Sequence, residues 1–368
     1  MSGPAPKSVR HGHVLVARLD SLGDLLLAGP AVRAVAAQAS WVTMLVGKGR
    51  LEEARLLPGV QEVIEFEAPW VVFNPEPLRG ELVQHLLDTL RRGRFDAALI
   101  LTSFHQSPLP LALLLRMAGI GWIGAISEDY PGSLLDLRHR VPADLPESER
   151  GLSLATAAGF EPDDDGARLA VRRPLPSATT WTGTDPYVVF HPGASVSSRR
   201  PTATHSRAMV SALSRAGHRV LVTGAPSERS LARYVAADHA EDLSGQLDVR
   251  HLAAVLDGAA VAIAPNTGPA HLAAAVGTPV VSLFSPVVRA SNWAPYGVPS
   301  VVLGDQTAAC RDTRARNCPI EGHPCLGSIK PRQVVEAAER LTSTAHRQQR
   351  PGIGLAGPAA HRREEAAG

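Results

Sequence analysis

Cysteine, lysine, aromatic residues and net charge are all scarce in this sequence of 368 residues. It has 3 cysteines, 4% aromatic residues and a formal net charge of +2. An odd number of cysteines argues against a structural disulfide framework. The few aromatic residues disfavour a stacking surface for single-stranded nucleic acid or a carbohydrate-binding face built on tryptophan. The balanced charge disfavours binding to a nucleic-acid backbone, so no nucleic acid is expected as a partner.

Long apolar runs are also missing. No stretch of about 18 uninterrupted apolar residues occurs, and the N-terminus lacks the basic-then-apolar run of a signal peptide. We therefore expect a soluble cytoplasmic protein that has no transmembrane segment but could contact a membrane peripherally. Only Lys7, Lys48 and Lys330 are lysines, so 34 of the 37 basic residues are arginines. Guanidinium is therefore the expected ligand for anions.

The length predicts two domains of ordinary size, each large enough to bury a core. Short apolar runs alternate with amphipathic segments along the chain, which is typical of mostly parallel, doubly wound α/β sheets. Strands are expected at 13–17, 41–46, 60–66, 95–101, 122–126, 187–191, 219–223, 260–264 and 280–284. Helices are expected at 25–38, 48–57, 77–92, 109–118, 206–215, 228–238, 249–256, 268–276 and 331–342.

A segment rich in Pro, Ser and Thr, where the apolar periodicity stops, separates the two domains. We place a Rossmann-like domain at 11–172, a linker at 173–185, a second Rossmann-like domain at 186–330 and a final helical segment at 331–346. Residues 347–368 have no periodicity and few large apolar side chains, which predicts a disordered tail.

Residues Gly119 to Gly124 match G-x-G-x-x-G, the pattern of dinucleotide-binding proteins. That function requires a strand before the glycines and a helix after them. Here the expected order is reversed, with a helix before and a strand after. The glycines therefore more plausibly provide a helix C-cap and a tight turn.

The loop 18–24 follows the first strand, at the edge where open α/β sheets bind ligands. Its S-L-G-D core gives Asp24 two equally supported roles. The carboxylate could cap the next helix, or it could act as a general base. Ser21 and Gly23 would then form a loop that lets a substrate approach the backbone closely.

The second domain has two further loops suited to an anion. Ser195, Arg199 and Arg200 follow the strand at 187–191, and hydroxyl, backbone N–H and guanidinium groups together suit a diphosphate. A surface loop with solvated arginines is the alternative. The second loop precedes the helix at 268–276, where Thr267 and Gly268 would expose helical N–H groups to an anion. The candidate donor-binding residues are Ser195, Arg199, Arg200, Glu228, Asn266, Thr267, Gly268 and His271.

All three cysteines fall within one stretch that also contains a histidine. Cys310, Cys318, His323 and Cys325 could together hold a zinc ion, because thiolate and imidazole are its preferred ligands. Their spacing matches no common zinc motif, so a compact surface loop without metal is the favoured interpretation.

Taken in order, these motifs resemble glycosyltransferase family 9, whose best-known members are ADP-heptose:lipopolysaccharide heptosyltransferases. The resemblance runs from about residue 13 to 342 and is carried by the combination of S-L-G-D, the loop 191–201, Glu228, the segment 266–275 and C-P-I-E-G-H-P-C. It implies a GT-B fold, in which two Rossmann-like domains face each other across a cleft and the last helix packs back on the first domain. It also implies an inverting, metal-independent enzyme that uses no cofactor.

The resemblance assigns roles to individual residues. Asp24 would be the general base, Arg199 or Arg200 would neutralise the diphosphate leaving group, and Glu228 would bind the ribose. Thr267, Gly268 and His271 would line the phosphate end of the donor site.

Three features depart from the family's pattern. Asn266 stands where the family usually has Asp, the usual Trp before Pro201 is absent, and the late loop lacks a fourth cysteine. These departures indicate a branch distant from the lipopolysaccharide enzymes.

We therefore expect an inverting glycosyltransferase that moves a sugar from a nucleoside diphosphate to a hydroxyl acceptor. A heptose is the favoured sugar, and the acceptor is a glycan or a small natural-product core. Two alternatives remain open at this point: a nucleotide-sugar epimerase or hydrolase of the same fold, and a non-catalytic protein that binds nucleotide sugars.

Overall fold

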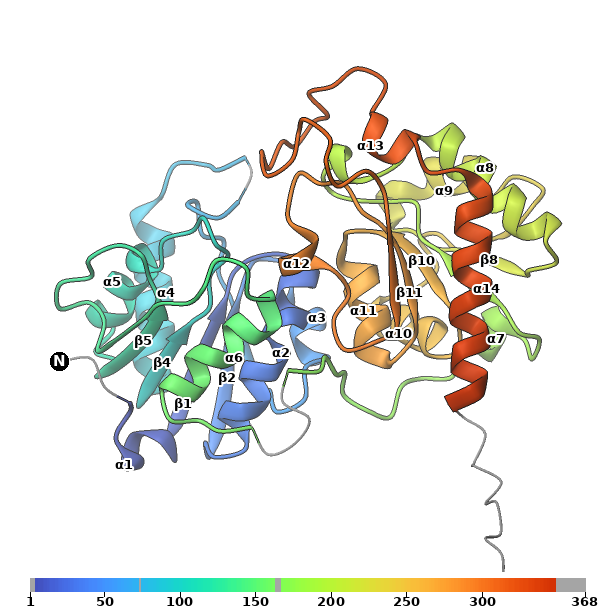
Figure 1. Cartoon of the computed structure of the whole chain (residues 1–368). Coiled ribbons are helices and arrows are strands. Elements are labelled where there is room, and N and C mark those ends of the chain that lie inside the picture. Colours follow the sequence, from blue (N-terminus) through green and yellow to red (C-terminus); the bar gives the residue numbers. More distant parts are fainter. Residues whose placement is uncertain (1–3, 73, 163–166, 349–368) are drawn as a thin grey trace, which may run out of the picture.

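The computed structural model describes residues 4–72, 74–162 and 167–348, which form two domains side by side (Figure 1). Each domain contains one six-stranded sheet, and every strand pair in both sheets is parallel. The strand orders are β3-β2-β1-β4-β5-β6 and β12-β11-β10-β7-β8-β9. The expectation of two parallel-sheet, Rossmann-like domains is therefore confirmed.

The first domain alternates strands with helices that cover both faces of its sheet. Its strands are β1 (His13–Arg18), β2 (Trp41–Val46), β3 (Glu62–Glu65), β4 (Ala97–Ile100), β5 (Trp122–Ile126) and β6 (Leu137–His139). Its helices are α1 (Lys7–Arg10), α2 (Leu22–Ala36), α3 (Leu51–Arg55), α4 (Gly80–Gly93), α5 (Leu109–Met117) and α6 (Glu147–Ala157). The central strands are continuous apolar runs because both of their faces are buried.

The second domain repeats this pattern with shorter strands. They are β7 (Val188–Phe190), β8 (Val220–Val222), β9 (Glu241–Asp242), β10 (Ala262–Pro265), β11 (Val280–Leu283) and β12 (Ser300–Leu303). Its helices are α7 (Thr179–Thr182), η1 (Ser197–Arg199), α8 (Ala203–Arg215), η2 (Pro226–Glu228), α9 (Arg229–Ala236), α10 (Val249–Asp257), α11 (Gly268–Val276), α12 (Ala290–Trp293), α13 (Pro324–Gly327) and α14 (Pro331–Gln348).

The chain passes from one domain to the other between two consecutive arginines. The N–H of Arg172 donates to the carbonyl of Leu56 in the first domain at 2.6 Å. The guanidinium of Arg173 instead makes two hydrogen bonds, of 2.8 and 2.7 Å, to the carboxylate of Asp257 in the second. Within the segment 173–185 the structure has one short helix, α7.

The last helix belongs to the second domain, so the expectation that it packs back on the first is wrong. Val334, Ala337, Ala338 and Leu341 follow helical spacing and are buried in the core of the second domain. The helix lies against α8 and β11, on the side away from the first domain (Figure 1). Its apolar stripe fits the open face of its own sheet. It extends to Gln348, and the rest of the predicted tail, 349–368, lies outside the described residues.

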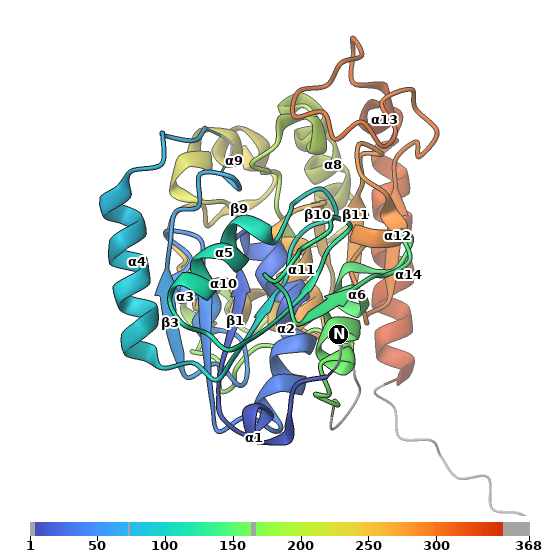
Figure 2. The same ribbon diagram turned by 90° about the vertical axis from the view of Figure 1, so that its left-hand side faces the viewer.

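The two domains share an interface built from α2, α6 and α11. One hydrophobic cluster contains residues of both domains, such as Leu25 in α2 and Leu272 in α11. Next to it, the side chain of Asn292 in the α12 region donates to the carbonyls of Ala143 and Leu145, at 3.0 and 2.8 Å. These contacts hold α12 of the second domain against the segment that leads into α6 (Figure 2).

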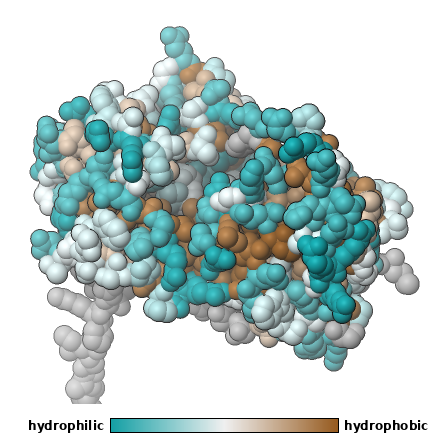
Figure 3. Space-filling view, turned by 180° about the vertical axis from the view of Figure 1, so that it is seen from behind, coloured by the Kyte–Doolittle hydropathy of each residue, from teal (hydrophilic) through white to brown (hydrophobic). Residues whose placement is uncertain are grey.

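The surface seen from behind is mostly hydrophilic, with hydrophobic residues gathered near its middle (Figure 3). Across the part of the chain that the structure describes, no helix combines the length and the apolar character needed to cross a bilayer.

Candidate active site

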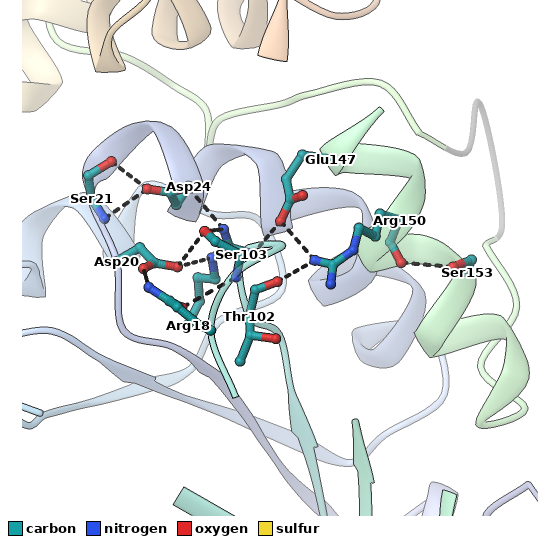
Figure 4. A network of polar contacts seen from close by, with 10 residues as sticks. Arg18, Asp20, Ser21, Asp24, Thr102, Ser103, Glu147, Arg150 and Ser153 are labelled. Atoms are coloured by element: carbon teal, nitrogen blue, oxygen red, sulfur yellow. Dashed lines mark hydrogen bonds and ion pairs between the residues drawn. The ribbon is translucent and has the colours of Figure 1, made fainter. Parts of the chain in front are cut away.

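The loop between β1 and α2 holds a buried guanidinium that joins three carboxylates (Figure 4). Arg18 is the last residue of β1 and is 2% exposed. Its Nε lies 2.8 Å from Asp20, one Nη 2.9 Å from Asp24 and the other Nη 2.7 Å from Glu147. It also donates to Ser103 Oγ at 2.9 Å. Arg18 therefore fixes the position of Asp24 from below.

Asp24 is the third residue of α2 and forms a capping box with Ser21. Its Oδ2 accepts from the N–H and the hydroxyl of Ser21, at 3.1 and 2.6 Å. The N-cap of α2 is therefore Ser21, and Asp24 completes its capping box from the third helical position instead of being the N-cap itself. Its side chain is still 14% exposed, so the carboxylate is accessible to a ligand.

The charges of these groups depend on one another. Burial opposes ionisation of Asp24, but the Arg18 guanidinium and the hydrogen bonds from Ser21 outweigh it and hold the pKa of Asp24 below its usual range. Burial has the larger effect at Asp20, whose pKa rises to about 6. At neutral pH Asp24 is thus a carboxylate.

The helix α11 starts directly opposite, from the second domain. Thr267 is its N-cap, yet the hydroxyl of Thr267 makes no capping hydrogen bond. Asn266 and His271 are 4% and 3% exposed, and the Nδ2 of Asn266 and the Nδ1 of His271 have no hydrogen-bond partner in the described chain. Burial lowers the pKa of His271 to about 4, so the imidazole is neutral. Unpaired buried polar atoms at a helix N-terminus are what a polar or anionic ligand would satisfy.

Two glycines let α2 and α11 approach each other. A Cβ atom on Gly23 would lie 2.9 Å from Cδ2 of His271, and one on Gly268 would lie 2.9 Å from a methyl carbon of Leu22. The structure therefore brings together S-L-G-D and N-T-G-P-A-H, which lie in different domains.

The donor loop, residues 191–200, follows β7 and ends in η1. Arg199 is partly buried with its Nε unpaired, and the charge of Asp24 acts on its pKa against the larger effect of burial. Arg200 is also partly buried, and Ser195 is exposed. The charge of Asp24 acts on Arg199. Of the two arginines, Arg199 is therefore the better candidate for an anion ligand near Asp24.

Glu228 lies beneath the same loop. A Cβ atom on Gly193 would be 2.0 Å from Glu228 Oε1, so only glycine fits above this carboxylate. The other oxygen, Oε2, accepts from the N–H of Ala225 at 2.8 Å and lies 3.6 Å from His191 Nε2. Glu228 thus belongs to the same site as the donor loop.

In the cysteine-containing stretch, two of the candidate zinc ligands are hydrogen-bonded to backbone carbonyls. His323 Nε2 is hydrogen-bonded to the carbonyl of Ser198 at 3.0 Å, and the thiol of Cys318 donates to the carbonyl of Ile320 at 3.2 Å. Cys310 and Cys325 are buried free thiols. Within the described ranges, no group of three or more His, Cys, Asp or Glu side chains is arranged to hold a metal ion.

The G-x-G-x-x-G segment starts just after α5 and its last three residues lie in β5, in the reversed order that the sequence predicted. Gly119 has a φ of 93° directly after the helix C-cap. It is therefore a helix C-cap glycine and not part of a dinucleotide site.

Sequence reasoning missed three residues of this site. Arg18 was detectable, because a charged residue at the end of a buried strand needs a partner. Glu147 and His105 gave no such signal, since Glu147 is brought to Arg18, and His105 near Asp24, from distant parts of the chain.

Comparisons with known proteins identify the family of this chain and related folds. The chain matches glycosyltransferase family 9 (heptosyltransferase) over residues 83–323. It is 26% identical to lipopolysaccharide heptosyltransferase 3 of Escherichia coli over 77% of this chain and 87% of that protein. A shorter match, 29% identical, covers 23% of this chain and 26% of lipooligosaccharide heptosyltransferase 2 of Campylobacter jejuni.

Solved structures of the same fold include ADP-heptose lipopolysaccharide heptosyltransferase II of E. coli, with a TM-score of 0.70, 19% identity and coverage of 91% of this chain and 99% of that one. A family 9 glycosyltransferase of Veillonella parvula has a TM-score of 0.73 at 17% identity, and the match covers 90% of this chain and 97% of that one. These likenesses confirm the GT-B architecture.

Proposed function

This chain belongs to glycosyltransferase family 9, and we propose that it is an inverting enzyme in which Asp24 deprotonates the acceptor hydroxyl. The donor in this proposal is a nucleoside-diphosphate sugar. ADP-heptose is the first to test, because a solved structure of the same fold is an ADP-heptose lipopolysaccharide heptosyltransferase. The acceptor is a hydroxyl of a glycan or a small natural-product core.

One observation carries the proposal: Asp24 of the first domain faces the start of α11 and Arg199 of the second. Gly23 lies beneath His271, one residue before Asp24. Arg199 and His271 both lie within the field of the Asp24 charge. A base on one domain and an anion site on the other is the arrangement that transfer between two substrates requires.

The reaction then proceeds by a single displacement. The acceptor O–H gives its proton to Asp24 while its oxygen forms a bond to the anomeric carbon. The bond from that carbon to the diphosphate oxygen breaks, and the electron pair stays on the diphosphate. Attack opposite to the leaving group inverts the anomeric configuration. Arg199 would neutralise the charge that develops on the diphosphate, which is the role that lets such an enzyme work without a metal.

The places of the other candidate residues around this site suggest which part of the donor each would contact. Glu228 would accept hydrogen bonds from the ribose hydroxyls, and the unpaired Asn266 amide would meet a sugar hydroxyl. Thr267, Gly268 and His271 would surround the phosphate end, where helical N–H groups favour an anion.

The first test replaces Asp24 by Asn, which keeps the shape and removes the base. We expect turnover to fall about 1000-fold, which lies within the usual range of general-base contributions. The dissociation constant for ADP, measured by calorimetry, should change less than about threefold. Asp88→Asn on the exposed face of α4 is the matched control and should keep full activity.

Three results would contradict the proposal. Retained turnover in Asp24→Asn would remove Asp24 as the base. Consumption of the donor without any acceptor would indicate an epimerase or hydrolase. Loss of activity on exhaustive chelation, restored by added metal, would contradict metal independence.

A further inference from the structure

The late loop, residues 304–323 between β12 and α13, is fastened onto the donor loop. The N–H of Ser198 donates to the carbonyl of Arg316 at 3.0 Å, and its hydroxyl donates to the carbonyl of Ala315 at 2.5 Å. The hydroxyl of Ser197 donates to Asn317 Oδ1 at 2.7 Å. Arg314 and Arg199 therefore lie on either side of one hydrogen-bonded junction.

The backbone holds Arg314 in a defined position beyond the carboxyl end of β11. The N–H groups of Asp312 and Arg314 donate to the carbonyls of Pro286 and Val287, at 3.0 and 2.8 Å. Both residues have a positive φ, 61° and 55°. Such a conformation is costly for residues other than glycine and is typical of positions that serve a function.

The charge of Arg314 is not neutralised by its neighbours. Asp312 forms ion pairs with Arg289 at 3.1 Å and Arg311 at 3.8 Å. Over the described ranges 4–72, 74–162 and 167–348, the side chains of Arg314 and Arg199 form no ion pair, and the Nε of Arg199 is buried without a hydrogen bond.

Arg314 is exposed, and its charge lies close enough to Arg199 to act on it. Burial is the main reason that the pKa of Arg199 is lowered, and the nearby Arg314 adds to it. The pKa of His105 in the first domain is also lowered, mainly by burial and further by the charges of the same two arginines. Among the residues that the structure describes, Asp24 is the one carboxylate whose charge acts on the pKa of Arg199, and both of its oxygens already accept from Arg18 and Ser21.

We propose that Arg314 is a second donor-binding cation, which together with Arg199 binds the diphosphate of the nucleotide sugar. This inference rests on the proposed function. Two neighbouring guanidinium groups repel each other unless an anion lies between them. A diphosphate supplies several negative oxygens, and guanidinium binds them in bidentate fashion. Because the pair lies near the proposed base, Arg314 meets the β-phosphate, which carries the sugar.

The test measures binding of ADP, GDP, UDP and dTDP and of their monophosphates by calorimetry. For the diphosphate that binds the wild type, Arg314→Gln should weaken binding about tenfold, as expected for a lost hydrogen bond between charged groups. The matching monophosphate, which lacks the β-phosphate, should change less than threefold. Arg314→Lys keeps the charge, so its diphosphate affinity should lie between those of the wild type and Arg314→Gln. This variant provides the test if Arg314→Gln does not fold.

Arg311→Gln is the matched control, because it removes the same charge from the same loop while its guanidinium is paired with Asp312. It should change diphosphate binding less than twofold. Equal diphosphate affinity in Arg314→Gln and wild type would overturn the inference. So would normal diphosphate binding with a raised KM for the acceptor, which would assign Arg314 to an acidic group of the acceptor. If the wild type binds none of the four diphosphates, the proposed function fails and the inference fails with it.

Discussion

Asp24 shows how one residue can be both a structural cap and a reactive group. The capping box with Ser21 explains why Asp is present at this position of α2 without any ligand. The capping role alone does not explain why a buried arginine supports the same carboxylate. Arg18 fixes its direction and keeps it ionised, and both properties are needed by a base that must point at one acceptor oxygen.

Replacing Arg18 by Lys tests this support. An ammonium group cannot bind Asp20, Asp24 and Glu147 in the planar arrangement of a guanidinium, so the pKa of Asp24 should rise. The acidic limb of the profile of kcat/KM against pH should therefore move to higher pH. The free energy of unfolding should fall by about 1 to 3 kcal/mol, because buried carboxylates lose hydrogen bonds.

Arg116→Lys is the control for this variant, since it alters an arginine–aspartate pair of the first domain remote from Asp24. It should leave the pH profile in place. An unchanged profile in Arg18→Lys would mean that Arg18 has only a structural role.

At the scale of elements, the contact between α2 and α11 depends on glycine. Gly23 and Gly29 lie in the same helix but differ in their surroundings. A Cβ atom on Gly23 would lie 2.9 Å from the buried His271, whereas one on Gly29 would lie 3.5 Å from a methyl of Leu57.

We therefore expect opposite effects from the two Gly→Ala substitutions in α2. Gly23→Ala should push His271 and the start of α11 away and lower kcat/KM at least tenfold. Gly29→Ala should keep activity and raise the free energy of unfolding by about 0.5 to 1 kcal/mol, because alanine favours the helix. Activity assays with thermal melts distinguish the two, and full activity in Gly23→Ala would show that the contact is not required.

Element prediction succeeded where the apolar pattern was strong and failed at the edges. The central strands, such as β1 and β4, are continuous apolar runs and were predictable. Three of the four edge strands, β6, β9 and β12, were missed, whereas β3 falls within the strand expected at 60–66. The missed strands have two to four residues each, and only one residue among them is fully buried, so their pattern is weak.

At the scale of the whole molecule, buried neutral histidines make the protein sensitive to acid. Burial brings the pKa of His271 to about 4 and lowers that of His191. In the unfolded chain both titrate near 6.5, so the unfolded state binds more protons below that pH. The free energy of unfolding should therefore fall as the pH decreases from about 6.5 to about 4, by about 3 kcal/mol for His271. The raised pKa of Asp20 opposes this over part of the range.

Urea unfolding between pH 8 and pH 5 measures this dependence. His271→Gln, which does not titrate, should lose less stability on acidification than the wild type. Equal pH dependence in the two proteins would show that His271 is not the source of the acid sensitivity.

Local sequence patterns are enough to predict the two parallel-sheet domains and the loops that carry Asp24 and Asn266. These features depend on local patterns: apolar runs, a glycine before a helix, and a capping residue at its start. Only the tertiary structure decided which distant groups meet. Glu147 reaches Arg18 across 129 residues of chain, and Gly23 meets His271 between domains. The last helix packs on its own domain because its apolar stripe fits that sheet. The loops that carry Arg314 and Arg199 meet because hydrogen bonds join two segments far apart in sequence. No local pattern encodes these pairings, because each depends on packing between separate elements.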